Sequence, residues 1–227
     1  MKTYKWLICS FPMPIRGIVE KLSMHIYDEN DGNGFILAQI RENSVSGKFV
    51  TKKNNESKIK DPFGNENVIK FVSYETTVFT IFEDEQWLIE IENPGRSIKP
   101  FLNMLIKIFG FNFYIEELNI NLRLVIDEIE SKLGKLNISK IEVTDINIKN
   151  KGLGILTIKS QVDSRTLLEN EILNQKFYKF KSFQGTFISK ELSGGWIELK
   201  SNSSLNVKNI PTTLFLESFR DIIRNCI

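Results

Sequence analysis

Two stretches with one pattern, Gly154-Ile-Leu-Thr-Ile-Lys-Ser160 and Gly195-Trp-Ile-Glu-Leu-Lys-Ser201, organise the chain. Both follow Gly-x-apolar-x-apolar-Lys-Ser, and they are offset by 41 residues. Alternation of apolar and polar residues is typical of a half-buried strand. In each case another strand pattern precedes the stretch and a helical pattern follows it. We therefore predict a duplicated ββα unit over residues 141–175 and 182–225.

The residues before the repeats show the same two kinds of pattern. Strand-like alternation covers residues 35–41, 47–51 and 68–82, and helical spacing of apolar residues covers 97–109 and 122–133. The sequence thus predicts an α+β fold, in which antiparallel β-hairpins pack with amphipathic helices. We expect two domains, an N-terminal one over residues 1–115 and a C-terminal one over 116–227 that holds the two repeats.

The stretch from residue 52 to residue 67 interrupts the N-terminal pattern. It is rich in Lys and Asn and contains Asp61-Pro-Phe-Gly64, which is typical of a turn. Polar segments of this kind between periodic segments favour surface loops. We expect a mobile, basic loop near residues 52–67.

Composition narrows the functional classes. The chain has 227 residues, 26% of them charged and 17 of them Phe, which is a globular composition with enough length for a sizeable core. Its one histidine, His25, excludes a multi-histidine zinc site, and its two cysteines, Cys9 and Cys226, suit reduced thiols. No apolar stretch reaches the roughly 18 residues of a membrane helix. We expect a cytoplasmic protein with no membrane partner, no cofactor and no bound metal, and the wealth of Lys, Ile and Asn favours a bacterial or phage source.

The basic residues are concentrated in the repeats. Residues 135–208 hold 12 Lys and Arg against 7 Asp and Glu, whereas residues 1–134 hold 16 against 19. Within the basic region, residues 176–183 interleave lysines with aromatic residues as Lys-Phe-Tyr-Lys-Phe-Lys-Ser-Phe. A polyanion would be attracted to this part of the chain first.

If residues 176–183 form a strand, alternate side chains share a face. One face would then carry two aromatic residues and two lysines, which could stack on bases and contact phosphates as single-strand binders do. The other interpretation is that aromatic residues face the core while lysines protect an edge strand. The candidate nucleic-acid contacts are Lys176, Phe177, Lys179, Lys181, Phe183 and Lys190, together with Lys52 and Lys53 of the predicted loop.

Glu198-Leu-Lys200 is the nearest match to a catalytic motif. A carboxylate and a lysine two residues apart on a strand could hold a divalent cation and stabilise a phosphoryl transition state, as in metal-dependent nucleases with a Glu-x-Lys centre. Such a centre needs a further acidic ligand, for which Asp145 and Asp163 are available. The first repeat has Thr157 in place of the glutamate, so any half-exposed strand could show the motif by chance.

The sequence therefore favours a non-enzymatic interaction subunit of a larger assembly. We expect protein partners, and nucleic acid as a further partner of the basic C-terminal half. Two alternatives stay open at this point. One is a metal-dependent nuclease centred on Glu198 and Lys200, and the other is a self-associating structural protein, a homo-oligomer that uses unpaired strand edges.

Overall fold

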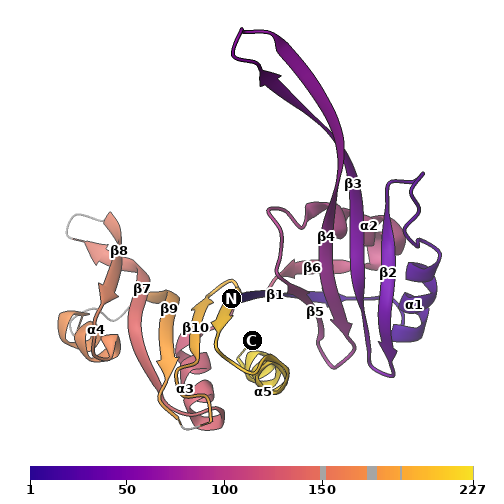
Figure 1. Ribbon diagram of the computed structural model, residues 1–227. Helices are drawn as coiled ribbons and strands as arrows, with labels where there is room; N and C mark the ends of the chain where they lie inside the picture. The colour runs from indigo at the N-terminus through magenta and orange to yellow at the C-terminus, as the bar shows by residue number, and fades with distance from the viewer. Residues whose placement is uncertain (149–151, 173–177, 190, 227) are drawn as a thin grey trace. The chain divides into compact units, whose positions relative to one another are not determined.

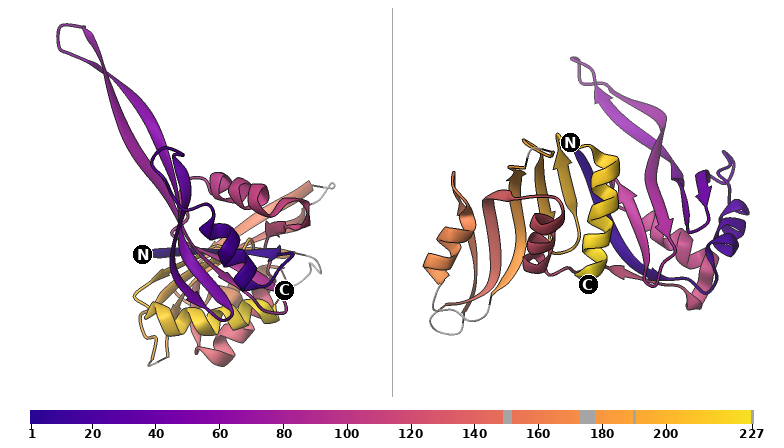
Figure 2. Two further views of the ribbon diagram at one scale, coloured as in Figure 1. Left: turned by 90° about the vertical axis from the view of Figure 1, so that its right-hand side faces the viewer. Right: turned by 90° about the horizontal axis from the view of Figure 1, so that it is seen from below.

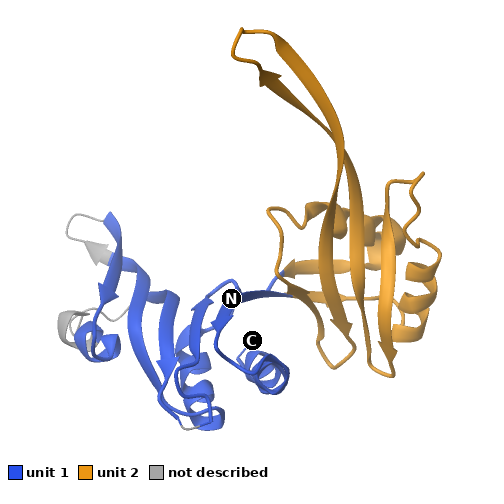
Figure 3. Ribbon diagram, viewed as in Figure 1, with its two compact units in different colours: residues 1–6, 117–227 blue, residues 7–116 orange. Residues whose placement is uncertain are grey.

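Strand β1 (Lys2–Ser10) belongs to both of the compact units into which the chain folds (Figure 3). One unit comprises residues 7–116, and the other comprises residues 1–6 and 117–227. The computed structural model describes residues 1–148, 152–172, 178–189 and 191–226 (Figure 1). The predicted boundary between residues 115 and 116 lies close to this division, but the first six residues join the C-terminal unit.

The unit of residues 7–116 is an antiparallel sheet in the order β2-β3-β4-β5-β1 with helices packed against it. Helix α2 carries Phe101, whose ring lies 5.1 to 6.4 Å from those of Phe35, Phe49 and Phe79 on three neighbouring strands. These four rings are buried and form the centre of the core. The elements are α1 (Ile15–Ser23), β2 (Asn33–Arg41), β3 (Ser44–Lys60), β4 (Glu66–Phe82), β5 (Trp87–Glu92), α2 (Lys99–Phe109), the 3₁₀ turn η1 (Gly110–Asn112) and β6 (Tyr114–Glu117).

The stretch predicted as a loop near residues 52–67 is mostly strand. Strands β3 and β4 pair from Ser44↔Phe82 to Lys60↔Glu66 and form a long two-stranded ribbon (Figures 1 and 2). Its turn is closed by the Asp61 carboxylate, which accepts hydrogen bonds from the amides of Phe63 and Asn65. The alternation is missing from the sequence because neither face of the ribbon is buried. Lysine and asparagine therefore reflect exposure to water here, not the absence of pairing.

The unit of residues 1–6 and 117–227 contains an antiparallel sheet in the order β1-β11-β10-β9-β7-β8. Helices α3 and α5 lie on the face turned to the viewer in the right panel of Figure 2. On that face α5 places Phe219 5.4 Å from the ring of Trp6, and both are buried. The elements are α3 (Leu122–Lys132), β7 (Leu136–Ile148), β8 (Gly152–Lys159), α4 (Ser164–Ile172), β9 (Lys179–Phe187), β10 (Trp196–Lys200), β11 (Leu205–Lys208) and α5 (Thr212–Asn225).

The α+β class is confirmed, but the duplicated ββα unit is not. The first predicted copy has two strands before its helix, β7 and β8, whereas the second has three, β9, β10 and β11. The two Gly-x-apolar-x-apolar strands also lie in different surroundings. Among the described strands, β8 pairs with β7 alone at the end of the strand order, and β10 lies between β9 and β11. A shared strand pattern therefore does not establish a repeat.

Among the described residues, no helix has the length and apolar character needed to cross a membrane.

Candidate nucleic-acid interface

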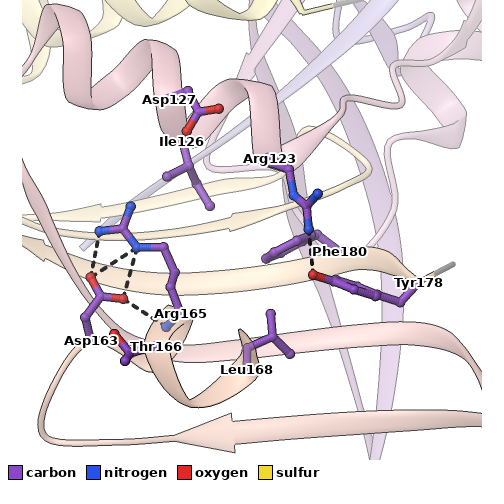
Figure 4. A pocket seen from close by; sticks show the side chains of 9 residues that line it. All are labelled: Arg123, Ile126, Asp127, Asp163, Arg165, Thr166, Leu168, Tyr178 and Phe180. Carbon is purple, nitrogen blue, oxygen red and sulfur yellow. Dashed lines mark hydrogen bonds and ion pairs between the residues drawn. The ribbon is translucent and has the colours of Figure 1, made fainter. Parts of the chain in front are cut away.

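Two adjoining hollows lie in the C-terminal unit beside the N-terminus of helix α3 and the start of strand β9. Their volumes are about 620 and 600 Å³, within the range of small-molecule and cofactor sites. Both are lined by Arg123, Tyr178 and Phe180, so these three side chains form the wall between them. Figure 4 shows this wall from the first hollow.

The shared wall is a packed cluster of one arginine and two aromatic rings. The guanidinium carbon of Arg123 lies 5.4 Å from the ring centroids of both Tyr178 and Phe180. Its Nη2 also donates a hydrogen bond of 2.6 Å to the Tyr178 hydroxyl (Figure 4). Cation–π attraction and this hydrogen bond hold the arginine beside the rings. The cluster offers both a positive charge and aromatic surface to a ligand.

Local backbone structure explains why Arg123 lies at this position. Asn121 caps helix α3 by accepting a hydrogen bond of 3.1 Å from the amide of Arg123. Leu122, Val125 and Ile126 turn to the core, and Arg123 lies at the side of this buried stripe, about 100° from Leu122 around the helix. The segment before the helix is tied to the sheet, because Ile120 N donates to Ser201 O and Ser201 N donates to Lys181 O, both at 2.9 Å.

A bulge in β9 determines where its side chains point. Phe183 pairs with Ile141 and Phe180 pairs with Val143, so Lys181 is an additional residue on this strand. Because Ile141 and Val143 are two residues apart, Phe180 and Phe183 share the helix-covered face of the sheet. Lys179 and Phe183, which strict alternation would place on one face, therefore lie on opposite faces, while Phe177 of the same predicted face falls outside the described residues. Because Lys181 is an additional residue, the alternation shifts by one position, and Phe183 lies on the core side of the sheet.

The second hollow is positively charged. Of the described residues that line it, Arg123, Lys179 and Lys181 are cationic and none is acidic. The other polar lining groups are uncharged hydrogen-bonding residues, namely Asn119, Asn121, Thr144, Tyr178 and Ser201. Such a set of donors suits an anionic ligand that also presents apolar or aromatic surface.

Both lysines form ion pairs at the edge of this hollow. Lys179 Nζ lies 3.2 Å from a carboxylate oxygen of Asp145, and Lys181 Nζ lies 2.6 Å from one of Glu142. The side chains of Lys179 and Lys181 are 81% and 52% exposed. The Asp145 side chain is 43% exposed, and exposed pairs contribute little net stability, so a phosphate can replace this carboxylate at small cost. The Glu142 side chain is only 19% exposed, so Lys181 is held more firmly in its pair than Lys179.

The first hollow is electrically balanced and built around Arg165. The Arg165 guanidinium donates to both carboxylate oxygens of Glu130 at 2.8 and 3.0 Å, and to Asp163 at 2.6 Å (Figure 4 shows the Asp163 contacts). Hydrogen bonds from Arg165 hold the pKa of Glu130 below its usual value, against the opposing effect of partial burial. Partial burial would raise the pKa of Asp163, but the hydrogen bonds from Arg165 outweigh it and the pKa is lowered. This network joins α3 to α4 and stabilises the lining of the first hollow.

Neither the protein-family models nor the curated proteins that were compared match this sequence.

The structure brings together only part of the predicted nucleic-acid contacts. Lys179 and Lys181 line the second hollow, whereas Phe183 is fully buried in the core. Lys52 and Lys53 lie in the other unit, where they pair with Glu29 and Glu75 at 2.7 and 2.6 Å. Lys176, Phe177 and Lys190 fall outside the described residues.

Glu198 and Lys200 lie on the face of the sheet opposite the helices, because Leu199 between them is buried. The two carboxylate oxygens of Glu198 accept hydrogen bonds from Gln184 at 2.9 Å and Asn206 at 2.7 Å. Partial burial would raise the pKa of Glu198, but these two bonds together with nearby Lys200 and Lys140 lower it. Glu198 thus joins strands β9, β10 and β11.

The acidic residues suggested as further metal ligands have other partners. Asp163 is bound to Arg165, and Asp145 is paired with Lys179. In the part of the chain that the structure describes, no three His, Cys, Asp or Glu side chains are grouped as a metal site would require.

Sequence reasoning missed Arg123 and Asn121. They belong to a helix whose apolar stripe was recognised, but the polar side of that helix carried no motif. The interleaved stretch at residues 176–183 overlaps strand β9, whose first residues line the second hollow. Arg123 reaches this strand only because the N-terminus of α3 packs beside the start of β9 in the folded protein.

Proposed function

We propose that the protein is a non-enzymatic accessory subunit that binds single-stranded nucleic acid in the second hollow of its C-terminal unit. The observation that carries the proposal is the lining of this hollow, in which three cationic side chains lie around a partly exposed aromatic pair and no lining residue is a carboxylate. Phosphates would contact Lys179 and Lys181. A base would stack against the Arg123–Tyr178–Phe180 cluster.

The chemistry favours a single strand over a duplex. Bases of a single strand can leave the stack and lie on aromatic rings or on guanidinium groups. Tyr178 and Phe180 are partly exposed at the hollow, and their ring centroids lie 5.8 Å apart. Side-chain amides and hydroxyls from Asn119, Asn121 and Ser201 lie around them and can bond base edges or sugars. A hollow of about 600 Å³ accommodates one or two nucleotides, so each site would hold a short segment of strand.

The proposal is tested by fluorescence anisotropy with a labelled oligothymidine and a labelled oligouridine at several salt concentrations. The two phosphate contacts, made by Lys179 and Lys181, give a slope of about −1.4 for log K against log salt on a single strand. Replacing Lys179 and Lys181 together by Ala should flatten this slope by about 1.4. Arg123→Ala should weaken binding roughly 5- to 100-fold, in keeping with the loss of one stacked base.

Lys48→Ala is the matched control, because Lys48 is an exposed lysine on β3 of the other unit. It removes the same charge and should leave both the affinity and the slope unchanged. Absence of salt-dependent binding, or an equal loss in Lys48→Ala, would refute the assignment of this hollow.

A further inference from the structure

The ribbon formed by β3 and β4 leaves its sheet and continues as two strands only. The last pair between β2 and β3 is Asn33↔Thr51, and the pairing of β4 with β5 begins at Val78. Among the described strands, β3 neighbours only β2 and β4, and β4 neighbours only β3 and β5. We call residues 52–74 the arm; each of its strands has one unpaired edge. A two-stranded ribbon alone is marginally stable in water, whereas three or more strands are stable.

The direction of the backbone amides along the arm follows from two hydrogen bonds. Lys52 N donates to Gly32 O, just before β2, and therefore points away from β4. Asp61 N donates to Asn65 O across the turn and points inward. In an antiparallel pair the direction alternates with each residue and is shared by cross-strand partners. The amides of the even-numbered residues therefore point outward, and on β4 these are Glu66, Val68, Lys70, Val72 and Tyr74.

The two edges of the arm differ in chemistry. Strand β3 carries Lys52, Lys53, Lys58 and Lys60 within nine residues, and lysines on an edge strand prevent pairing with another chain. Strand β4 instead carries Val68, Ile69, Phe71, Val72 and Tyr74, each between 48% and 51% exposed. β-Branched and aromatic residues of this kind favour strand pairing. The β4 edge is thus open to an added strand and the β3 edge is protected.

The two faces of the arm differ as well. One face carries the charged side chains, which pair across the strands as Lys70 with Glu56 at 3.2 Å and Lys60 with Glu66 at 3.0 Å. The other face is uncharged from Asn55 to Ser73. It consists of Asn55, Ser57, Ile59, Asn67, Ile69, Phe71 and Ser73.

We propose that the β4 edge of the arm pairs antiparallel with the same edge of a second copy of this chain. A two-fold axis perpendicular to the ribbon then produces a four-stranded sheet in the order β3-β4-β4-β3. Such an axis keeps the uncharged faces of both copies on one side, where they form one continuous surface. Each copy thereby supplies the additional strands that the other copy's ribbon lacks.

Side-chain chemistry selects the register. With the axis at Phe71, Lys70 lies opposite Val72 of the other copy, Val68 lies opposite Tyr74, and the two Phe71 rings are neighbours. Aromatic and β-branched cross-strand pairs each contribute roughly 0.2–1 kcal/mol. An axis at Lys70 would instead place two lysines opposite each other, which is destabilising. The lysine-rich β3 edges stay on the outside of the four-stranded sheet.

Cysteine cross-linking tests the pairing and its register. The outward amides belong to even-numbered residues, so the amide of Phe71 points to β3 of its own chain and not to the second copy. The two Phe71 residues would therefore be a non-hydrogen-bonded pair, whose Cα atoms should lie about 4.5 Å apart. This distance permits a disulfide. Phe71→Cys should therefore form a covalent dimer under copper–phenanthroline oxidation. Asn55→Cys is the matched control, because Asn55 pairs with Phe71 on the outer strand and lies three strand spacings, about 14 Å, from its counterpart. The native Cys9 and Cys226 are both buried.

Sedimentation velocity on proline variants supplies a second test that does not depend on cysteine. Val72→Pro removes an outward amide of the β4 edge, and Asn54→Pro removes one from its cross-strand partner on the β3 edge. We expect the unmodified chain and Asn54→Pro to form dimers in the micromolar range and Val72→Pro to be a monomer, with unchanged far-UV circular dichroism. A monomeric unmodified chain, equal behaviour of the two proline variants, or equal cross-linking of the two cysteine variants would overturn the proposal.

Discussion

Replacement of Arg165 by Met removes the cation that joins helix α3 to helix α4 in the wall of the first hollow. Arg165 donates to Glu130, to Asp163 and to the carbonyl of Leu136, and its side chain is 32% exposed. Breaking a fully buried ion pair costs about 3–5 kcal/mol, whereas an exposed pair contributes about 0–1 kcal/mol. The side chains of Glu130 and Asp163 are 24% and 27% exposed, so we expect a loss of about 2 kcal/mol at neutral pH.

The size of this loss should depend on pH. The pKa values of Glu130 and Asp163 are lowered in the folded protein. A carboxyl group with a lowered pKa contributes stability that is present above its unfolded pKa, about 4, and is lost as the pH falls through the folded value. Arg165→Met removes the side-chain hydrogen bonds and the charge that lower these pKa values, while the backbone hydrogen bonds that also lower them remain. The difference in free energy of unfolding between the two proteins should therefore be largest near neutral pH and shrink in acid.

Urea unfolding followed by tryptophan fluorescence measures this difference. In a Trp87→Phe background the signal comes from Trp6 and Trp196, which both belong to the C-terminal unit. Lys132→Met is the control, since Lys132 pairs with Glu128 one helical turn away at 2.9 Å and the two side chains are 40% and 37% exposed. It should cost less than about 0.5 kcal/mol. A similarly small loss for Arg165→Met, or a loss that is equal at neutral and at acid pH, would refute the reasoning.

Two further predictions concern the N-terminal unit. Gly34→Ala should destabilise the protein by about 1–3 kcal/mol, because the added Cβ would lie 2.5 Å from the backbone of Tyr27. Gly95→Ala is the control and should change the urea midpoint little, because its Cβ would meet nothing within 4 Å. Equal urea midpoints for the two variants would contradict this prediction. Burial raises the pKa of the Cys9 thiol far above its usual value, so in a Cys226→Ser background Cys9 should react with Ellman's reagent much more slowly in the native protein than in urea. A native rate equal to that in urea would show that the thiol is accessible.

The sequence predicted those elements in which one face is buried. Apolar spacing indicated helix α3, where Leu122, Val125, Ile126 and Ile129 are all buried. It failed for residues 52–60 of the arm, where polar side chains on two exposed faces leave no apolar period, although it did indicate β4 from Val68 onward. The extra strand β11 was also missed, since four residues are too few to show alternation. Periodicity follows burial, so an exposed strand with polar side chains on both faces shows none.

The candidate site was only partly predictable for a related reason. Lys179 and Lys181 stood out because lysine and aromatic residues interleave there, but the bulge at Lys181 could not be foreseen and it moved Phe183 to the core. Arg123 is 55 residues away from Tyr178 in the chain. Their contact depends on tertiary pairing that no local pattern encodes.

Photo-cross-linking tests most directly whether nucleic acid lies in the second hollow. An oligonucleotide that carries 5-iodouracil forms a covalent bond mainly with aromatic side chains on which the base stacks, and mass spectrometry identifies the residue. The account predicts cross-links at Tyr178 or Phe180 that disappear in excess unlabelled strand and weaken in Arg123→Ala. Cross-links located elsewhere, for example at Trp196 or at Phe63 of the arm, or no specific cross-link at all, would contradict it.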